Sequence, residues 1–139
     1  MRTLALDVGD RRIGVAVSDP TGLIARPLAI ITRKNEPSDI QAVTELAREY
    51  GAGQIIVGLP LSLDGRLGLQ AEKVRLFASA LAAALVIPIE LRDERFSTIT
   101  AREHRLESGA GKKKRRAPDD DAAAAVILQN YLDEMRSSR

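Results

Sequence analysis

The sequence of 139 residues contains no cysteine and one histidine, and aromatic residues make up only 3% of it. The absence of cysteine excludes disulfides, thiolate metal sites and cysteine nucleophiles, and it is compatible with a reducing compartment. Because aromatic residues are few, Leu, Ile, Val and Ala must build the core. The same scarcity leaves few side chains on which splayed nucleic acid bases could stack.

Long apolar runs are also lacking. No run approaches the roughly 18 apolar residues of a membrane span, and Asp7 interrupts the N-terminal run where a secretory signal would be continuous. We therefore expect a cytoplasmic protein with no membrane partner. The length fits one domain, residues 1–139, that folds around its own core.

The 21 Lys and Arg residues nearly balance 19 Asp and Glu residues, so the formal net charge of +2 says little about partners. The distribution of charge says more, because five consecutive basic residues follow a glycine-containing segment. This pattern predicts a flexible basic loop at about 109–118 that attracts a polyanion, although a solvated loop without a specific role also explains it. The basic residues are Lys112, Lys113, Lys114, Arg115 and Arg116.

Alternating apolar residues and turn signals predict strands at 3–8, 13–18, 23–32, 54–57 and 89–91. Pro27 indicates that the third strand lies at an edge or contains a bulge, because proline lacks an amide hydrogen. A hairpin followed by alternating strands and helices predicts an α/β fold, in which helices cover the faces of a mixed sheet.

Helical spacing predicts a helix capped by Ser38 and ended by Gly51, and a second helix over 69–85. A third helix is expected from Ser97 or Thr98 to about Ser108. The last helix follows Pro118, and its apolar face consists of Ala124, Ile127, Leu128, Tyr131 and Met135.

Three acidic clusters fall at the ends of predicted elements: Asp7, the pair Asp93-Glu94, and Asp119 to Asp121. A carboxylate in an apolar strand is costly unless a positive group offsets it, and carboxylates brought together repel one another unless a cation lies between them. Oxygen ligands in a chain without cysteine favour Mg²⁺ or Mn²⁺. His104, the one histidine, lies in a polar stretch and suits the surface.

Spacing favours Asp120 as the inward-facing member of the last cluster, because it continues the apolar stripe of the helix. Asp119 suits the helix N-cap, and Asp121 competes for the inward position. Asp7 shares its strand face with Thr3 and Ala5, which are small enough to leave room for a ligand. Simpler explanations also fit these residues. A helix N-terminus favours acidic residues such as Asp119 to Asp121, and an Asp near a glycine, such as Asp7, can serve a turn.

Four segments together resemble the YqgF/RuvX family of pre-16S rRNA nucleases, which are related to Holliday-junction resolvases in the RNase H-like superfamily. The resemblance covers nearly the whole chain. The segments are Asp7 to Ala16 with Ser18-Asp19, Gly58-Leu59-Pro60 with Asp64-Gly65, Asp93 to Thr98, and an Asp followed by alanines and Ile127-Leu128-Gln129.

The resemblance implies an RNase H-like fold, with a mixed five-stranded sheet whose first three strands are antiparallel and whose later strands are parallel. It also implies a metal-dependent nuclease in which Asp7, Glu94 and Asp120 are catalytic and hold Mg²⁺ or Mn²⁺. The sequence departs from the family pattern just before the last Asp, where Arg115-Arg116-Ala117-Pro118-Asp119 stands. Asp119 and Asp121 therefore stay open as alternatives.

Arg11, Arg12 and Arg95 adjoin the carboxylate motifs and, with the basic run Lys112 to Arg116, could contact phosphates, although surface ion pairs explain each Arg equally well. We expect a structured nucleic acid as substrate. Processing of the 5′ end of pre-16S rRNA needs only a monomer, whereas resolving a branched DNA junction normally requires a homodimer.

Two other interpretations compete with a nuclease. One is a non-catalytic RNA-binding module of ribosome assembly. The other starts from Asp7-x-Gly9, which is similar to the phosphate loop of actin-like kinases and ATPases, but the chain is too short for their two domains.

Overall fold

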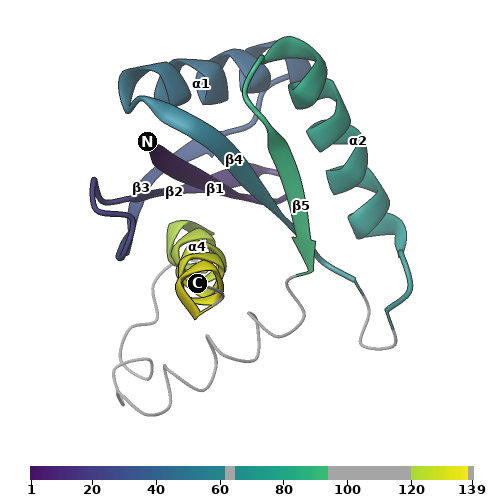
Figure 1. The fold of residues 1–139 in the computed structure, drawn as a ribbon. Coiled ribbons are helices and arrows are strands. Elements are labelled where there is room, and N and C mark those ends of the chain that lie inside the picture. The colour runs from purple at the N-terminus through teal and green to yellow at the C-terminus, as the bar shows by residue number, and fades with distance from the viewer. Residues whose placement is uncertain (62–64, 94–119, 138–139) are drawn as a thin grey trace, which may run out of the picture.

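The computed structural model describes residues 1–61, 65–93 and 120–137. Helices α1 and α2 lie on one face of a sheet, and α4 lies on the other (Figure 1). The elements are β1 (Arg2–Val8), β2 (Arg12–Ser18), β3 (Ala25–Thr32), α1 (Glu36–Glu49), β4 (Ala52–Leu59), α2 (Leu69–Ala84), β5 (Ile89–Asp93) and α4 (Asp120–Ser137).

The five strands form one sheet in the order β3-β2-β1-β4-β5. β2 is antiparallel to both β1 and β3, while β4 runs parallel to β1 and β5 runs parallel to β4. This arrangement confirms the predicted mixed sheet with three antiparallel strands first. Because β1, β4 and β5 are parallel, their carboxyl ends lie at the same edge of the sheet.

Pro27 behaves as the sequence predicts. β3 is an edge strand, so the missing amide hydrogen of Pro27 costs no hydrogen bond to a further strand. The register between β2 and β3 also shifts between Val15 and Ala16, and Ala16 is the residue opposite Pro27. The strand thus combines both predicted features, an edge position and a bulge.

The start of α1 corrects one prediction. Its N-cap is Asn35, whose Oδ1 accepts the Ser38 N–H at 2.9 Å, so Ser38 lies inside the first turn and is not the cap. Pro37 explains the earlier start, because proline is tolerated in the first turn, where an amide hydrogen has no helical partner. Gly51, with φ at +63°, ends the helix as predicted.

β4 begins at Ala52 and β5 reaches Asp93, so both strands are longer than predicted. The extension of β5 follows from pairing, since Leu59 and Asp93 are partners in the parallel ladder. The helix predicted from Ser97 or Thr98 to Ser108 and the basic loop predicted at about 109–118 lie outside the described residues.

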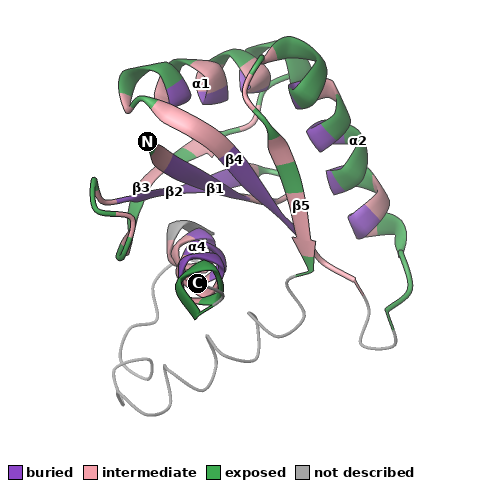
Figure 2. Ribbon diagram, in the orientation of Figure 1, coloured by how far each residue is buried: buried purple, intermediate pink, exposed green. Residues whose placement is uncertain are grey.

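The sheet separates two apolar clusters, and its central strands are buried on both faces (Figure 2). The larger cluster joins alternate residues of β1, β2 and β4 to α1 and α2. The smaller one joins the opposite alternation to α4, and it consists of Ala5, Ala16, Ile56, Ala124, Ile127, Leu128, Tyr131 and Leu132.

The apolar face of α4 is wider than predicted, and its buried part ends before the last predicted residue. Met135, predicted for this face, is 36% exposed, whereas Leu132 is only 7% exposed. Met135 lies near the end of the helix, where less of the sheet remains to cover it. In the part of the chain that the structure describes, no helix has the length and apolar content needed to cross a membrane.

Small side chains allow α4 to approach the sheet, since Ala5, Ala16 and Ala124 are all fully buried between them. We expect Ala124→Leu to lower the free energy of unfolding by about 1–3 kcal/mol, because extra methylenes in a packed core force side chains and backbone apart. Urea denaturation measures this, with Ala83→Leu on the exposed side of α2 as the control. Equal stability of the two variants would contradict close packing of α4.

Candidate functional site

Asp7 is half-buried near the carboxyl end of β1 and points to the α4 side of the sheet. Its neighbours Leu6 and Val8 belong to the α1/α2 cluster, whereas Ala5, two residues earlier, belongs to the α4 cluster. The predicted strand face shared with Thr3 and Ala5 is therefore confirmed, because alternate residues of a strand point to the same side.

The room beside Asp7 comes from a different source than predicted. Ala5 is fully covered by α4 and leaves no space for a ligand. The residue opposite Asp7 on β2 is Gly14, and the register that pairs Leu6 with Val57 brings Gly58 of β4 to its other side. Asp7 therefore lies between two glycines, which carry no side chain at the positions directly opposite it.

β5 ends at the same edge of the sheet. Ile89 and Leu91 pack on the α1/α2 side, while Arg92 contacts Tyr131 and Glu134 of α4 and so lies on the opposite side. The strand alternation gives Asp93 the orientation of Leu91, away from the α4 side. Of the pair Asp93-Glu94, the described member thus faces away from Asp7.

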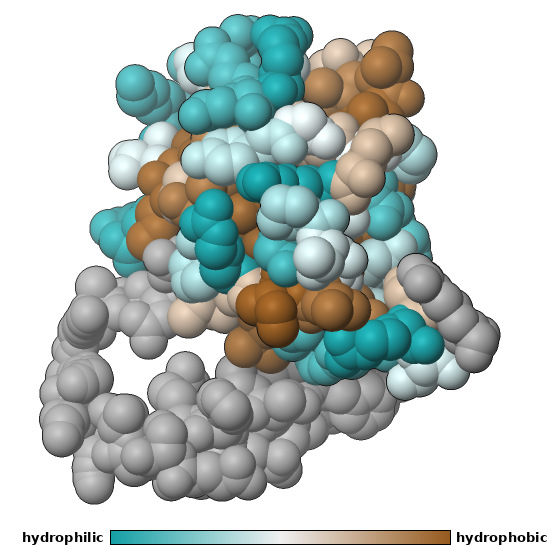
Figure 3. Space-filling view, turned by 60° about the vertical axis from the view of Figure 1, so that its left-hand side comes forward, coloured by the Kyte–Doolittle hydropathy of each residue, from teal (hydrophilic) through white to brown (hydrophobic). Residues whose placement is uncertain are grey.

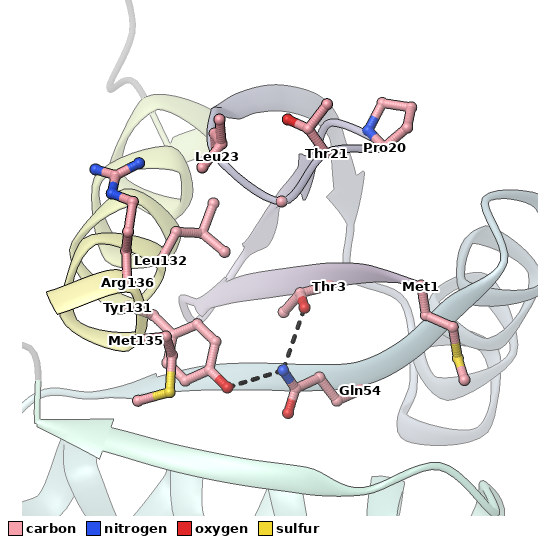
Figure 4. A pocket seen from close by; sticks show the side chains of 11 residues that line it. Met1, Thr3, Pro20, Thr21, Leu23, Gln54, Tyr131, Leu132, Met135 and Arg136 are labelled. Atoms are coloured by element: carbon pink, nitrogen blue, oxygen red, sulfur yellow. Dashed lines mark hydrogen bonds between the residues drawn. The ribbon is translucent and has the colours of Figure 1, made fainter. Parts of the chain in front are cut away.

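The contacts of α4 set its direction over the sheet. Gln54 Nε2 donates to Tyr131 Oη at 2.9 Å and to Thr3 Oγ1 at 3.2 Å, near the start of β1 (Figure 4). Ala124 lies in the same apolar cluster as Ala5, a residue of β1 that comes after Thr3. The C-terminal half of α4 therefore lies over the start of β1, and the start of α4 lies toward the carboxyl end of β1.

The distance from Ala124 to the start of α4 is similar to the distance from Ala5 to Asp7. From Ala124 to Asp120 the helix advances about 6 Å at about 1.5 Å per residue, and from Ala5 to Asp7 the strand advances about 7 Å at about 3.3 Å per residue. The structure therefore brings three places together at one edge of the sheet: Asp7, the end of β5 and the start of α4.

Most other residues of the predicted site have no described side chain. Glu94, Asp119, Arg95 and the basic run Lys112 to Arg116 lie outside the described residues, and only the backbone of Asp120 and Asp121 is described. Within the described ranges, no three Asp, Glu or His side chains lie close enough to hold a metal ion. Metal ligation by Asp7, Glu94 and Asp120 stays a prediction.

Arg11 lies in the turn that joins β1 to β2, and Arg12 is the first residue of β2, so both lie at the same edge of the sheet as Asp7. The Gly9 N–H donates to the Arg12 carbonyl at 2.8 Å and closes this turn. Arg11 is exposed and Arg12 is half-buried. In the same turn Asp10 forms an ion pair with Lys73 of α2 at 3.6 Å, and because both side chains are exposed the pair adds little stability.

Two contacts that hold α4 in place were not predicted. Gln129 accepts the Ala25 N–H through Oε1 and donates to the Leu23 carbonyl through Nε2, both at 2.9 Å, which ties the helix to the start of β3. On the other side, the Arg92 guanidinium pairs with Glu134 and lies 5.1 Å from the centre of the Tyr131 ring. Gln129 belongs to one of the four segments that carry the family resemblance, and this was the only sequence feature that pointed to a role for it.

A pocket of about 560 Å³ lies at the opposite end of β1, between the β2–β3 connection and the C-terminal half of α4 (Figure 4). Thr3, Gln54, Tyr131 and Leu23 line it among others, and hydrogen bonds from the Thr21 hydroxyl and the Ile24 N–H hold the pKa of Asp19 nearby at about 2. From Thr3 to Asp7 the strand spans about 13 Å. The pocket is therefore separate from the edge that carries Asp7.

Apolar side chains also reach the surface on the side of the β2–β3 connection, where brown patches interrupt the hydrophilic surface (Figure 3). Leu23 and Ile24 are 44% and 58% exposed there. Single exposed apolar residues are normal on a protein surface and need no functional explanation.

Comparison with known proteins assigns the family. The family model RuvX, described as Holliday junction resolvase, matches residues 1–134. A Pelotomaculum thermopropionicum protein named "Putative pre-16S rRNA nuclease" is 44% identical over 140 residues, which cover 100% of this chain and 91% of that protein. A Moorella thermoacetica protein of the same name is 45% identical over 135 residues, with 97% and 96% covered.

Solved structures agree on the fold. RuvC from T. thermophilus in complex with a Holliday junction substrate superposes with a TM-score of 0.70 at 15% identity, covering 99% of this chain and 96% of that one. The fowlpox virus Holliday junction resolvase gives a TM-score of 0.55 at 14% identity, covering 96% and 99%. The expected RNase H-like fold is thus confirmed, and the chain belongs to the RuvX family, also called YqgF.

Proposed function

We propose that this protein is a divalent-metal-dependent nuclease that processes the 5′ end of pre-16S rRNA in the cytoplasm. The observation that carries the proposal is the position of Asp7, a carboxylate between two glycines at the sheet edge where β5 ends and α4 begins. The names of relatives at about 44% identity over the whole chain support the substrate.

In the proposed site Asp7, Glu94 and Asp120 hold one or two Mg²⁺ or Mn²⁺ ions. All donors are carboxylate oxygens, which suit these hard cations. When bound there, an ion would supply a lower pKa for the attacking water and neutralisation of charge on the scissile phosphate. The chain's own part is to hold the three carboxylates in place, with glycines at the cross-strand positions on either side of Asp7.

Glu94 is favoured by the alternation of β5. Arg92 lies on the α4 side of the sheet, and a continued alternation beyond the end of β5 would give Glu94 the orientation of Asp7. Asp93 is not proposed as a ligand, because strand alternation turns it to the opposite side of the sheet from Asp7.

Asp120 is favoured over Asp121 by the two flanks of α4. Asp120 lies at helical spacing from Tyr131 and Glu134, which contact Gln54 of β4 and Arg92 of β5. Asp121 lies about 80° around the helix from Tyr131 and about 80° from Gln129, which contacts the start of β3, so it faces between the two flanks. The flank that faces β4 and β5 is the one nearer to Asp7 and to the end of β5.

Basic residues would position the backbone of the substrate. Arg11 and Arg12 lie in the turn directly after β1, and we propose that they contact phosphates together with Arg95 and the basic run Lys112 to Arg116. Phosphate contacts fix the register of a nucleic acid without reading its sequence. In this proposal, residues 1–139 form one nuclease domain.

A second candidate is junction resolution. It is favoured by the family description and by the T. thermophilus RuvC structure that contains a Holliday junction. Paired incisions in a four-way junction would require a homodimer with two matching sites, whereas rRNA processing is possible for a monomer.

The test is a cleavage assay on a 5′ fragment of pre-16S rRNA and on a four-way DNA junction, with Mg²⁺ or Mn²⁺ and with a chelator. We expect cleavage near the mature RNA end, loss of cleavage with chelator and its return with excess metal. Symmetric cuts in the junction by a dimeric protein would favour resolution. Binding of the RNA without cleavage of either substrate would contradict the nuclease and favour an RNA-binding module.

A further inference from the structure

The turn from Gly9 to Arg12 connects the residue proposed to bind metal, Asp7, with the residues proposed to contact phosphates, Arg11 and Arg12. Val8 pairs with Ile13 directly before the turn, and the Gly9 N–H donates to the Arg12 carbonyl at 2.8 Å. A shift of this turn would therefore move both parts of the proposed site.

A single residue from another part of the chain holds this turn at two points. Arg33, the first residue after β3, donates its backbone N–H to the Arg11 carbonyl at 2.8 Å. Its Nη1 donates to the Gly9 carbonyl at 2.9 Å. These two carbonyls lie on either side of Asp10, so the middle of the turn is fixed from both directions.

The guanidinium of Arg33 is itself held by a buried carboxylate. Its Nε donates to Asp39 Oδ2 at 3.0 Å, and the Asp39 side chain is only 3% exposed. The other oxygen of Asp39 accepts the Lys34 N–H at 3.0 Å. On its flat side, the guanidinium lies 5.0 Å from the centre of the Phe77 ring of α2.

This geometry requires arginine. One planar group donates in two fixed directions, to Asp39 and to Gly9, while it stacks on a ring, and the compact ammonium of lysine does not reproduce that fork. Because two of its donors are engaged inside the protein, Arg33 serves to place other residues and not to bind substrate. We propose that Arg33 is a positioning residue that holds the Gly9–Arg12 turn, and with it Asp7, for cleavage; this rests on the proposed function.

The test compares Arg33→Lys with the wild-type protein in steady-state cleavage. We expect kcat to fall by about 10- to 100-fold, because small displacements of reacting groups cost rates of that order. KM should change much less, since Arg33 does not bind substrate and most of the residues proposed to contact phosphates lie outside this turn. Arg26→Lys changes an exposed arginine of β3, and this matched control should retain the wild-type kcat.

A readout independent of cleavage accompanies the kinetics. In Arg33→Lys, the Gly9 amide should exchange with solvent faster than in the wild type, whereas core amides of β1 such as that of Leu6 should not. If Arg33→Lys does not fold, Asp39→Asn takes its place, because it keeps the size and removes the charge that orients the guanidinium. It should show the same pattern with a smaller fall in kcat.

The outcomes separate the two proposals. A folded variant with wild-type kcat, or with unchanged exchange at Gly9, overturns the positioning role while the proposed function stands. A loss of thermal stability with unchanged kcat per folded molecule would mean that Arg33 is purely structural and would also overturn it. Absence of cleavage by the wild-type protein is instead the failure of the proposed function, and the positioning role fails with it.

Discussion

Asp7→Asn should reduce cleavage by at least about a thousandfold, because a bound metal ion supplies several kcal/mol of transition-state stabilisation and each factor of ten in rate corresponds to about 1.4 kcal/mol. Asn has nearly the same size as Asp, and the residue opposite Asp7 on β2 is a glycine, Gly14. The fold should therefore persist. The measurement is single-turnover cleavage with Mn²⁺, together with the affinity for Mn²⁺, which should also fall.

Asp10→Asn is the matched control for Asp7→Asn. Asp10 is an exposed carboxylate three positions later in the chain, and its ion pair with Lys73 is weak. This variant should cleave at close to the wild-type rate. Equal cleavage by the Asp7→Asn variant and the wild type would point to a contaminating nuclease and would favour the RNA-binding module.

Asp120→Asn should produce the second large loss, of about a hundredfold or more, for the same reason of metal-dependent stabilisation. Asp119→Asn and Asp121→Asn, made in parallel, should stay within a few-fold of the wild type. The reason is helical position, since Asp120 shares the flank of α4 that contacts β4 and β5, whereas Asp121 faces between this flank and the one that contacts β3.

The three parallel substitutions also control for stability. Each removes one negative charge from the start of α4, where acidic residues favourably interact with the helix dipole, so all three should lower stability by a similar small amount. Thermal unfolding checks this. A larger loss of cleavage in Asp121→Asn than in Asp120→Asn would show that the assignment of the two flanks is wrong.

Much of the fold could be predicted because it depends on local patterns. Alternation and helical spacing located every described strand and helix to within a few residues, and Pro27 identified an edge strand because its missing hydrogen is a local property. The cap of α1 was misplaced because Asn35 and Ser38 are both good capping residues. Choosing between them depends on where Pro37 enters the helix.

The candidate site was predictable in part. The orientation of Asp7 follows from strand alternation alone, so the sequence was sufficient to predict it. The glycines on either side of Asp7 could not be recognised, because Gly14 and Gly58 are its neighbours only through the register of β2 and β4. Arg33 was missed for the same reason, since its partners Gly9 and Asp39 lie on different elements.

The sequence by itself determined which residues point together within each strand and helix, because side-chain direction repeats with the local backbone period. It also determined the family, through segments that span nearly the whole chain. Only the tertiary structure decided which strands are neighbours, which flank of α4 faces β4 and β5, and which side chain supports the Gly9–Arg12 turn. Those choices depend on contacts between residues far apart in the chain, and no local period encodes them.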